Sequence, residues 1–262
     1  MTISVSIWSD IACPWCFVGK QRFERAAAEF ARQHGGGEAS DQVTINWRAF
    51  ELDPRPRSPD SRPYAERLAQ KYGRSVADAQ QMIDTMATNI AREGGQADFN
   101  RIVVANTFDA HRLIQWAATL DAEGATDSAQ HRLTDAFMRG YLGEGLDLSS
   151  QAQMLAVVEA AGLDQAAAQA VLAGDDFADK VREDEALAQH YGISGVPFFV
   201  IGRYGISGAQ ESAQLLEVLN TVRAEQAAAL TAKADEPPTA SAGAGSGACD
   251  IDGCDEPSNQ GK

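Results

Sequence analysis

Two cysteines near the start of the chain, Cys13 and Cys16, are the residues whose type and spacing point most directly to chemistry. Thiols three residues apart on a first helical turn have neighbouring side chains, so the pair can exist as a dithiol or as a disulfide. The unpaired N–H groups and positive dipole end of a helix stabilise a thiolate, which favours Cys13 as the attacking nucleophile. Cys16 is then the thiol that resolves the mixed disulfide.

The residues inside this motif favour redox chemistry over other uses of the same spacing. Pro14 has the fixed φ that suits the first helical position, and it lacks an N–H that would have no partner there. The C-x-x-C spacing also occurs in zinc sites and among inert buried cysteines. The sequence therefore predicts a redox pair, with a metal site or structural cysteines as the alternatives.

A second pair, Cys249 and Cys254, lies near the carboxyl end of the chain, with four residues between its thiols. The flanking aspartates disfavour a thiolate, so this pair is predicted to be the poorer nucleophile. A coil from residue 230 has a root-mean-square reach of about 25 Å, from which we predict an auxiliary redox relay with Cys13 and Cys16 in the same molecule. An idle tail and a metal clip are the alternatives.

The first pair lies where the pattern changes from strand to helix. Residues 2–8 alternate apolar and polar side chains, and residues 17–30 repeat apolar side chains at helical spacing. Glycines at 35–37 end this helix, and residues 43–50 alternate again. The opening of the chain is therefore predicted to be strand, helix, strand.

From about residue 63 to 191 the pattern is helical, with no convincing strand. Ser75 begins one helix with a capping box, and Asn106 is a candidate cap for another helix that carries His111 near its start. We expect a compact bundle of about 130 residues.

The pattern returns to strands after residue 192. Val196 and Pro197 lead into the apolar run 198–201, and a glycine-containing turn and a return strand complete a hairpin. Pro197 is either an ordinary hairpin entrance or a cis proline whose loop faces the cysteine pair. A last helix is expected over about 210–230, followed by a tail too poor in apolar side chains to fold alone.

Five segments, taken in this order, resemble the DsbA-like branch of the thioredoxin fold, and within it the FrnE family of dithiol–disulfide oxidoreductases. The segments are residues 9–16 (SDIACPWC), 50–54 (FELDP), 106–113 (NTFDAHRL), 192–199 (GISGVPFF) and 207–210 (SGAQ). The resemblance covers residues 1 to about 230.

The resemblance implies an α/β class protein, a thioredoxin fold with a large all-α insertion and a disordered C-terminal tail. We expect a discontinuous thioredoxin-like domain (residues 1–55 and 192–230), a helical insertion domain (56–191), and a flexible tail with the second cysteine pair (231–262).

The same resemblance implies that Cys13 and Cys16 form the redox centre, and that Val196–Pro197 is a cis-proline loop offering backbone groups to an incoming polypeptide. It also suggests that Asn106 and His111 line the cleft between the thioredoxin part and the helical insertion. A plain capping Asn and a surface His fit the pattern equally well.

Trp15 and Asp10, in and beside the motif, bear on how strongly the pair oxidises and on how Cys16 loses its proton. Trp15 stands between the cysteines where DsbA itself has His, so a cationic stabiliser of the thiolate is missing and a weaker oxidant is expected. Asp10 fits a proton shuttle for Cys16, and equally a surface or turn acid.

Charge and hydropathy argue against several classes of partner. The net charge of −15 argues against nucleic acid and anionic membranes. No apolar run approaches the roughly 20 residues of a membrane helix. The start of the chain lacks the basic and apolar regions of a signal peptide, so a cytoplasmic protein is expected.

The sequence thus predicts a thiol–disulfide oxidoreductase or isomerase that acts on protein or peptide disulfides, needs no cofactor and has an unknown redox partner. The alternatives are a metal-binding thiol protein and a glutathione-dependent transferase or isomerase on the same fold. Members of the latter families typically have a Ser at the position of Cys13.

Overall fold

The computed structural model describes residues 1–34, 42–55, 62–121 and 128–234. Its elements, in chain order, are β1 (Thr2–Ser9), α1 (Pro14–His34), β2 (Gln42–Ala49), α2 (Tyr64–Tyr72), α3 (Val76–Arg92), α4 (Phe108–Ala118), α5 (Ala129–Arg139), the short π-helix η1 (Gly140–Glu144), α6 (Gln151–Ala160), α7 (Gln165–Ala173), α8 (Ala178–His190), β3 (Phe198–Ile201), β4 (Tyr204–Ser207) and α9 (Ser212–Ala234).

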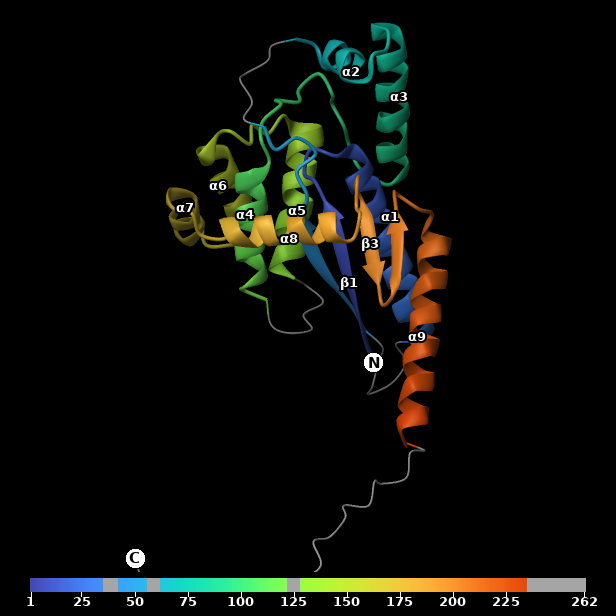
Figure 1. Ribbon diagram of the computed structural model, residues 1–262. Helices are drawn as coiled ribbons and strands as arrows, with labels where there is room; N and C mark the ends of the chain where they lie inside the picture. The colour runs from blue at the N-terminus through green and yellow to red at the C-terminus, as the bar shows by residue number, and fades with distance from the viewer. Residues whose placement is uncertain (35–41, 56–61, 122–127, 235–262) are drawn as a thin grey trace, which may run out of the picture.

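The four strands form one mixed sheet in the order β2-β1-β3-β4 (Figure 1). β1 and β2 are parallel and are connected through α1, as a parallel pair requires, whereas β3 is antiparallel to both β1 and β4. In the register of the sheet, Ile7 lies opposite Trp47 on one side and Phe199 on the other. The predicted opening strand, helix and strand and the predicted hairpin are confirmed.

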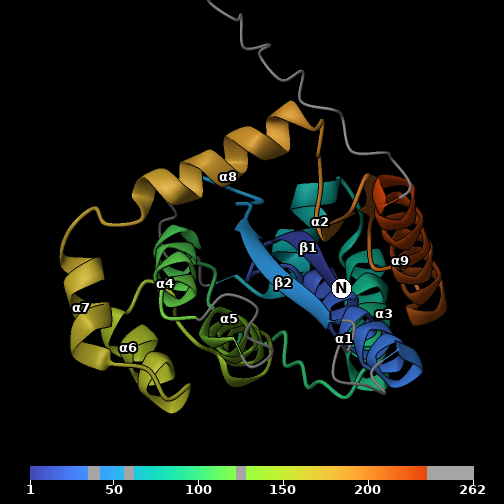
Figure 2. The ribbon, with the colours of Figure 1, turned by 90° about the horizontal axis from the view of Figure 1, so that it is seen from below.

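Helices cover both faces of the sheet (Figure 2). Alternate residues of β1, such as Val5 and Ile7, are buried with Phe23 of α1 and Leu219 of α9 in the main core. On the opposite face, Trp8 packs against α8 in a second cluster. Side chains on the two faces of β1 therefore pack into two different clusters, Val5 and Ile7 in the main core and Trp8 in the cluster under α8.

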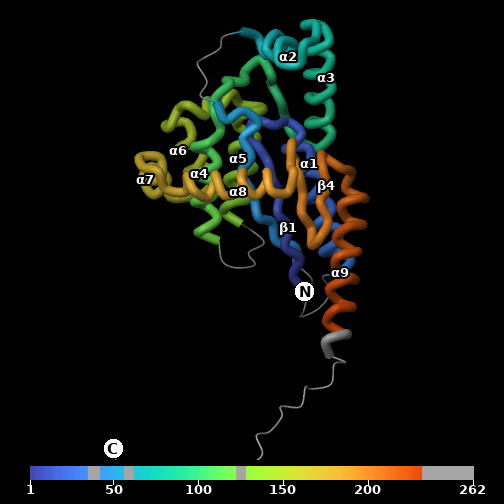
Figure 3. Tube along the Cα trace, viewed as in Figure 1, coloured from blue at the N-terminus to red at the C-terminus, as the bar shows by residue number. Residues whose placement is uncertain are grey.

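The helices between β2 and β3 form the predicted all-α insertion, and its described residues contain no strand. α2 and α3 pack together beyond the end of the sheet where β1 stops, while α4 and α5 lie beside β2 and α6 and α7 pack on their outer side (Figures 1 and 3). The predicted cap is present, because the Ser75 hydroxyl accepts a hydrogen bond from the Asp78 N–H at 3.0 Å. Of the insertion, the α2–α3 pair therefore lies over the end of the sheet that carries the first cysteine pair.

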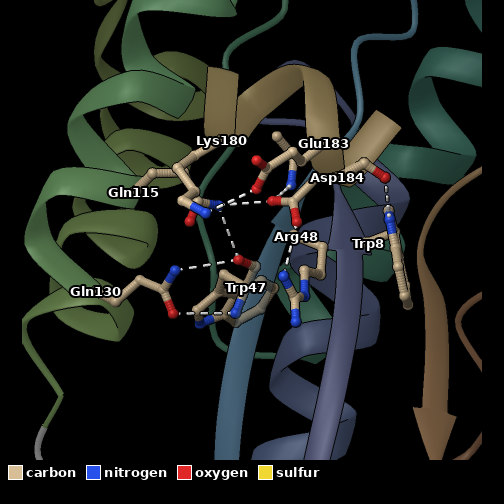
Figure 4. A network of polar contacts seen from close by, with 9 residues as sticks. Trp8, Trp47, Arg48, Gln115, Gln130, Lys180, Glu183 and Asp184 are labelled. Carbon is tan, nitrogen blue, oxygen red and sulfur yellow. Dashed lines mark hydrogen bonds and ion pairs between the residues drawn. The ribbon is translucent and has the colours of Figure 1, made fainter. Parts of the chain in front are cut away.

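The last helix of the insertion, α8, is tied to the sheet by a buried carboxylate (Figure 4). Asp184 accepts hydrogen bonds from the Ala49 N–H at 3.0 Å, the Arg48 guanidinium at 2.8 Å and the Gln115 amide at 2.8 Å. The Trp8 indole N–H donates to its backbone carbonyl at 2.9 Å. Asp184 thus fixes α8 and α4 against β2.

The expected fold class, a thioredoxin fold with a large helical insertion, is confirmed. The division into domains stays a prediction, and the expected disordered tail, with Cys249 and Cys254, lies outside the described residues from 235 onward. Among the helices that are described, none combines the length and the apolar character needed to cross a membrane.

Candidate redox site

The turn after β1 places Cys13 at the start of α1. The Cys13 N–H donates to the carbonyl of Asp10 at 3.1 Å, and the Cys16 N–H donates to the carbonyl of Cys13 at 3.0 Å. Pro14 is the first residue of the helix, as predicted. Both cysteines are free thiols, Cys13 5% exposed and Cys16 1% exposed. Cys13 is therefore the sulfur nearer to solvent.

The hairpin loop lies directly beside Cys13. The Val196–Pro197 peptide bond is cis, and the Cys13 Sγ lies 3.7 Å from the Val196 carbonyl oxygen. Gly19, one turn into α1, lies under the proline: a Cβ atom at Gly19 would come within 2.8 Å of Pro197 Cγ. The absence of a side chain at Gly19 therefore lets the loop approach α1.

Cys16 lies deeper in the protein, and this position affects its acidity. Burial raises the pKa of the Cys16 thiol well above its ordinary value, and the neighbouring Cys13 sulfur raises it further. The Ser9 hydroxyl acts in the opposite direction without cancelling these effects. Cys16 therefore stays protonated at neutral pH until another group takes its proton.

Asp10 is a buried acid, 2% exposed, and not a surface one. Its carboxylate accepts hydrogen bonds from the Leu52 N–H at 2.7 Å and the Ala12 N–H at 3.2 Å, and it lies 3.6 Å from His111 Nε2. Burial acts to raise the pKa of Asp10, but His111 and the two N–H groups outweigh it, so this pKa lies below its ordinary value. Asp10 is therefore an anion that holds two loops together.

Asn106 and His111 lie behind the site and do not appear among the described residues that line the cleft. The Asn106 side chain accepts from the Phe108 N–H at 2.8 Å at the start of α4 and donates to Glu51 at 2.7 Å, which fits the capping alternative. His111 is 3% exposed, so the surface alternative is wrong for it. Glu51 also binds Arg182 at 2.7 Å.

A cleft of about 640 Å³ opens beside Cys13, between the turn after β1 and the helices α2 and α3. Its lining includes four expected site residues and a set of cationic and apolar side chains. The expected residues are Asp10, Cys13, Pro14 and Trp15, and the charged and apolar side chains include Leu52, Asp53, Arg55, Arg62, Tyr64, Arg67, Lys71 and Tyr72. Trp15 lies at the edge of this cleft, and its side chain is 39% exposed.

Sequence reasoning missed two contributions to this site. Gly19 carries no chemical signal, and only its contact with Pro197 reveals its role. The α2 face that bears Arg67 is an ordinary amphipathic pattern in the sequence, and only the fold brings it opposite Cys13. No group of three or more metal-ligating His, Cys, Asp or Glu side chains gathers anywhere in the described part of the chain.

The geometry of α9 bears on the second cysteine pair. Arg25 of α1 donates to Ser212 of α9 at 3.2 Å, and His34 Nε2 lies 2.7 Å from Asn220 Oδ1, so the two helices run in the same direction. Both run away from α2 and α3 and toward the side of the sheet where the amino terminus lies (Figure 1). At a rise of 1.5 Å per residue, the end of α9 at Ala234 lies about 50 Å from the start of α1.

This distance exceeds the reach expected from the sequence. The last helix extends to Ala234, beyond the expected residue 230, so 14 residues connect it to Cys249. Fully extended, they span about 50 Å, which only just matches the distance to the start of α1. The expected root-mean-square reach of about 25 Å is therefore about half of this distance. A relay between the tail and the Cys13 of the same molecule stays a prediction, because Cys249 and Cys254 lie outside the described residues.

Comparison with known proteins gives the family of the chain. A family model described as a DsbA-like thioredoxin domain matches residues 4–220. A probable DsbA oxidoreductase of Streptomyces coelicolor is similar in structure, with a TM-score of 0.74 and 38% identity, over 85% of this chain and 91% of that one. YwbO, an uncharacterised protein of Bacillus subtilis (strain 168), is 26% identical over 212 residues, which cover 80% of this chain and 92% of YwbO.

A more distant likeness concerns the fold alone. A 2-hydroxychromene-2-carboxylate isomerase has a TM-score of 0.53 and 15% identity, over 88% of this chain and 98% of that one. The expected DsbA-like branch is confirmed by the family match, and the narrower FrnE assignment stays a prediction.

Proposed function

Because the chain belongs to the DsbA-like thioredoxin domain family, matched over residues 4–220, we propose that it is an oxidoreductase that exchanges protein disulfides through Cys13 and Cys16. The observation that carries this proposal is the position of the Cys13 sulfur, at the start of α1 and 3.7 Å from the Val196 carbonyl, on the wall of an open cleft. This position supports the proposed roles of Cys13 as nucleophile, Cys16 as resolving thiol and the Val196 carbonyl as a backbone docking group.

The proposed reaction has two exchange steps. In the reducing direction, the Cys13 thiolate attacks one sulfur of a substrate disulfide, forms a mixed disulfide and releases the other substrate sulfur as a thiolate. Cys16 then loses its proton and attacks the Cys13 sulfur, which closes the Cys13–Cys16 disulfide and releases the second substrate sulfur. Two electrons pass to the substrate, and a dithiol donor must reduce the pair again.

Two features of the site support a polypeptide substrate. The backbone beside Val196 and Pro197 can pair with an extended segment in the manner of an added strand. The exposed ring of Trp15 at the edge of the cleft offers apolar contact. A cytoplasmic setting, where thiols are kept reduced, would make the dithiol the resting form and would favour reduction or isomerisation.

Asp10 is proposed to position the site and not to accept the Cys16 proton. Its lowered pKa makes the carboxylate a weak base, while its oxygens bind the N–H groups of Ala12 and Leu52. The turn that carries Cys13 is thereby fixed to the segment after β2.

The test is trapping of the mixed disulfide. Cys16→Ser should accumulate a covalent complex with scrambled ribonuclease, whose disulfides Cys13 can attack, and this complex should disappear on addition of dithiothreitol. Cys13→Ser should form no complex and should no longer accelerate insulin reduction. An equal yield of complex from Cys13→Ser would contradict the proposal.

The second pair, Cys249 and Cys254, is proposed to relay electrons to or from Cys13 and Cys16. The 14 residues between α9 and Cys249 would have to be almost fully extended to reach the Cys13 of the same molecule, so exchange between two molecules is the favoured route. Mixing Cys13→Ser with a Cys249→Ser, Cys254→Ser double variant should restore turnover that the double variant alone has lost. Unchanged turnover and substrate range in the double variant would show that the relay does not exist.

A further inference from the structure

We infer that the cleft beside Cys13 selects disulfides whose cysteine lies next to carboxylates in a polypeptide, and that Arg67 of α2 is the residue that recognises them. This inference rests on the proposed redox function, since it names the substrate class of the same site. Three observations carry it: the charge of the cleft, the bonding of Arg67 and the apolar surface around both.

The charge of the cleft is opposite to that of the chain. The whole chain has 37 Asp and Glu against 22 Lys and Arg, whereas four cations and two carboxylates line the cleft. One carboxylate, Asp10, is 2% exposed and faces His111, and the other, Asp53, binds Arg55 at 2.8 Å. The excess positive charge therefore comes from the remaining cations, which lie on α2 and just before it.

Two of the nitrogen donors of the Arg67 guanidinium make no hydrogen bond to the described residues. Its Nε and Nη1 atoms are closed off from solvent and have no hydrogen-bond partner among the described residues, while Nη2 reaches the Ile102 carbonyl only at 3.4 Å. Its guanidinium lies over the Tyr64 ring, 5.4 Å from the centroid. A buried donor without an acceptor costs free energy, and a carboxylate can accept two parallel bonds from a guanidinium. Rotation of the long side chain toward an entering carboxylate would supply the missing acceptor.

The neighbours of Arg67 extend this surface. Lys71 lies four residues later in α2, on the same helical face, and also lines the cleft. Trp15 is 39% exposed, Leu52 40% and Tyr72 54%, so apolar surface alternates with the cations. A small anion would use only the charges, whereas an acidic polypeptide segment would use both, so the cleft favours the polypeptide.

The experiment compares two peptides that differ only in charge. Each carries one cysteine as a mixed disulfide with neutral thiopyridine, flanked by Asp in one peptide and by Asn in the other. Attack by Cys13 releases thiopyridone, which is followed by its absorbance, and Cys16 then releases the peptide thiol. The second-order rate constant of the reduced full-length protein should be about three- to tenfold larger for the Asp peptide, and the ratio should fall as salt is added.

Variants of α2 identify the residue responsible. Arg67→Met should bring the ratio of rate constants close to one, Arg67→Lys should keep part of the preference, and Arg74→Met, just beyond α2 and outside the cleft lining, should keep all of it. The rate constant for the Asn peptide should stay the same in Arg74→Met, which reports intact folding and intact thiol chemistry, and the ratio of the two rate constants within each Arg67 variant separates charge recognition from any general loss of activity.

Two results would overturn the inference while leaving the redox function in place. These are equal rate constants for the two peptides in the unmodified protein, and a preference undiminished in Arg67→Met. Failure of the folded protein to react with either peptide would overturn the redox function itself, and the inference with it.

Discussion

The carboxylate of Asp10 and the Nε2 atom of His111 lie 3.6 Å apart, both buried, although one follows β1 and the other belongs to α4. This contact joins the turn that carries Cys13 to the helical insertion. The Asp10–His111 contact therefore links the redox pair to the insertion beneath the cleft. A substitution of either residue should alter the position of the other.

Replacing Asp10 with Asn should destabilise the protein at neutral pH by about 1–3 kcal/mol, because a carboxylate that accepts two N–H bonds is lost. The folded-state pKa of Asp10 is depressed, so its stabilisation is present above the ordinary carboxyl pKa and is lost as the pH falls through the lower folded value. Urea unfolding of both proteins at pH 7 and below about pH 4 should show the difference shrinking in acid.

The same variant tests the positioning role. If Asp10 only positions the turn, the rate at which Cys16 resolves the mixed disulfide should change by less than about tenfold, with an unchanged pH profile. A loss of about a hundredfold or more, with a shifted profile, would make Asp10 the proton acceptor instead.

Cys16 should make the reduced protein less stable in alkali. Its folded-state pKa is raised, so the stabilisation from the neutral buried thiol is complete below the ordinary cysteine pKa and is lost as the pH rises through the folded value. Reduced wild-type protein should therefore lose more stability than Cys16→Ser between pH 8 and about pH 10, measured by urea unfolding. Parallel curves for the two proteins would contradict the raised pKa.

Gly19→Ala should slow the thiol chemistry and also destabilise the protein. The new methyl group would come within 2.8 Å of Pro197 Cγ and 3.3 Å of the Phe199 ring, so the proline loop must move away from α1. We expect kcat/KM for insulin reduction to fall about tenfold and stability to fall by about 1–3 kcal/mol, from overpacking. Gly174→Ala, where a Cβ has open space, is the control, and equal activities would contradict the proposed contact.

Lys20→Met should destabilise the protein by about 3 kcal/mol at neutral pH. Lys20 is 2% exposed and lies 2.6 Å from both Glu24 and Asp135, which would be left without this cation. Burial acts to raise the pKa of each of these carboxyls, but the partners around them, Lys20 included, outweigh it and hold both pKa values down. The stabilisation is therefore lost as the pH falls through these depressed values, and the loss caused by the mutation should shrink in acid.

The control for Lys20 is Lys180→Met, which removes an exposed ion pair with Glu183. Its effect on urea unfolding should stay below about 1 kcal/mol, because water and salt screen that pair. Equal losses in the two variants would show that burial adds nothing to the Lys20 contacts.

Much of the fold could be predicted from the sequence because its signals are local. The alternation in β1 and β2, the proline at the first position of α1 and the Ser75 cap depend on neighbours along the chain, and each was placed correctly. The cysteine pair was found for the same reason, since two thiols at i and i+3 of a helix start need no other segment to be recognised.

The tertiary structure decided what depends on distant segments. Three features of the site join residues far apart in sequence, where periodicity carries no signal. They are the contact of His111 with Asp10, the approach of Pro197 to Gly19, and the position of Arg67 in the lining of the cleft beside Cys13. The direction of α9 likewise decided how far the tail can reach. Local patterns fix which elements form, whereas packing fixes which side chains meet, and the chemistry proposed here depends on both.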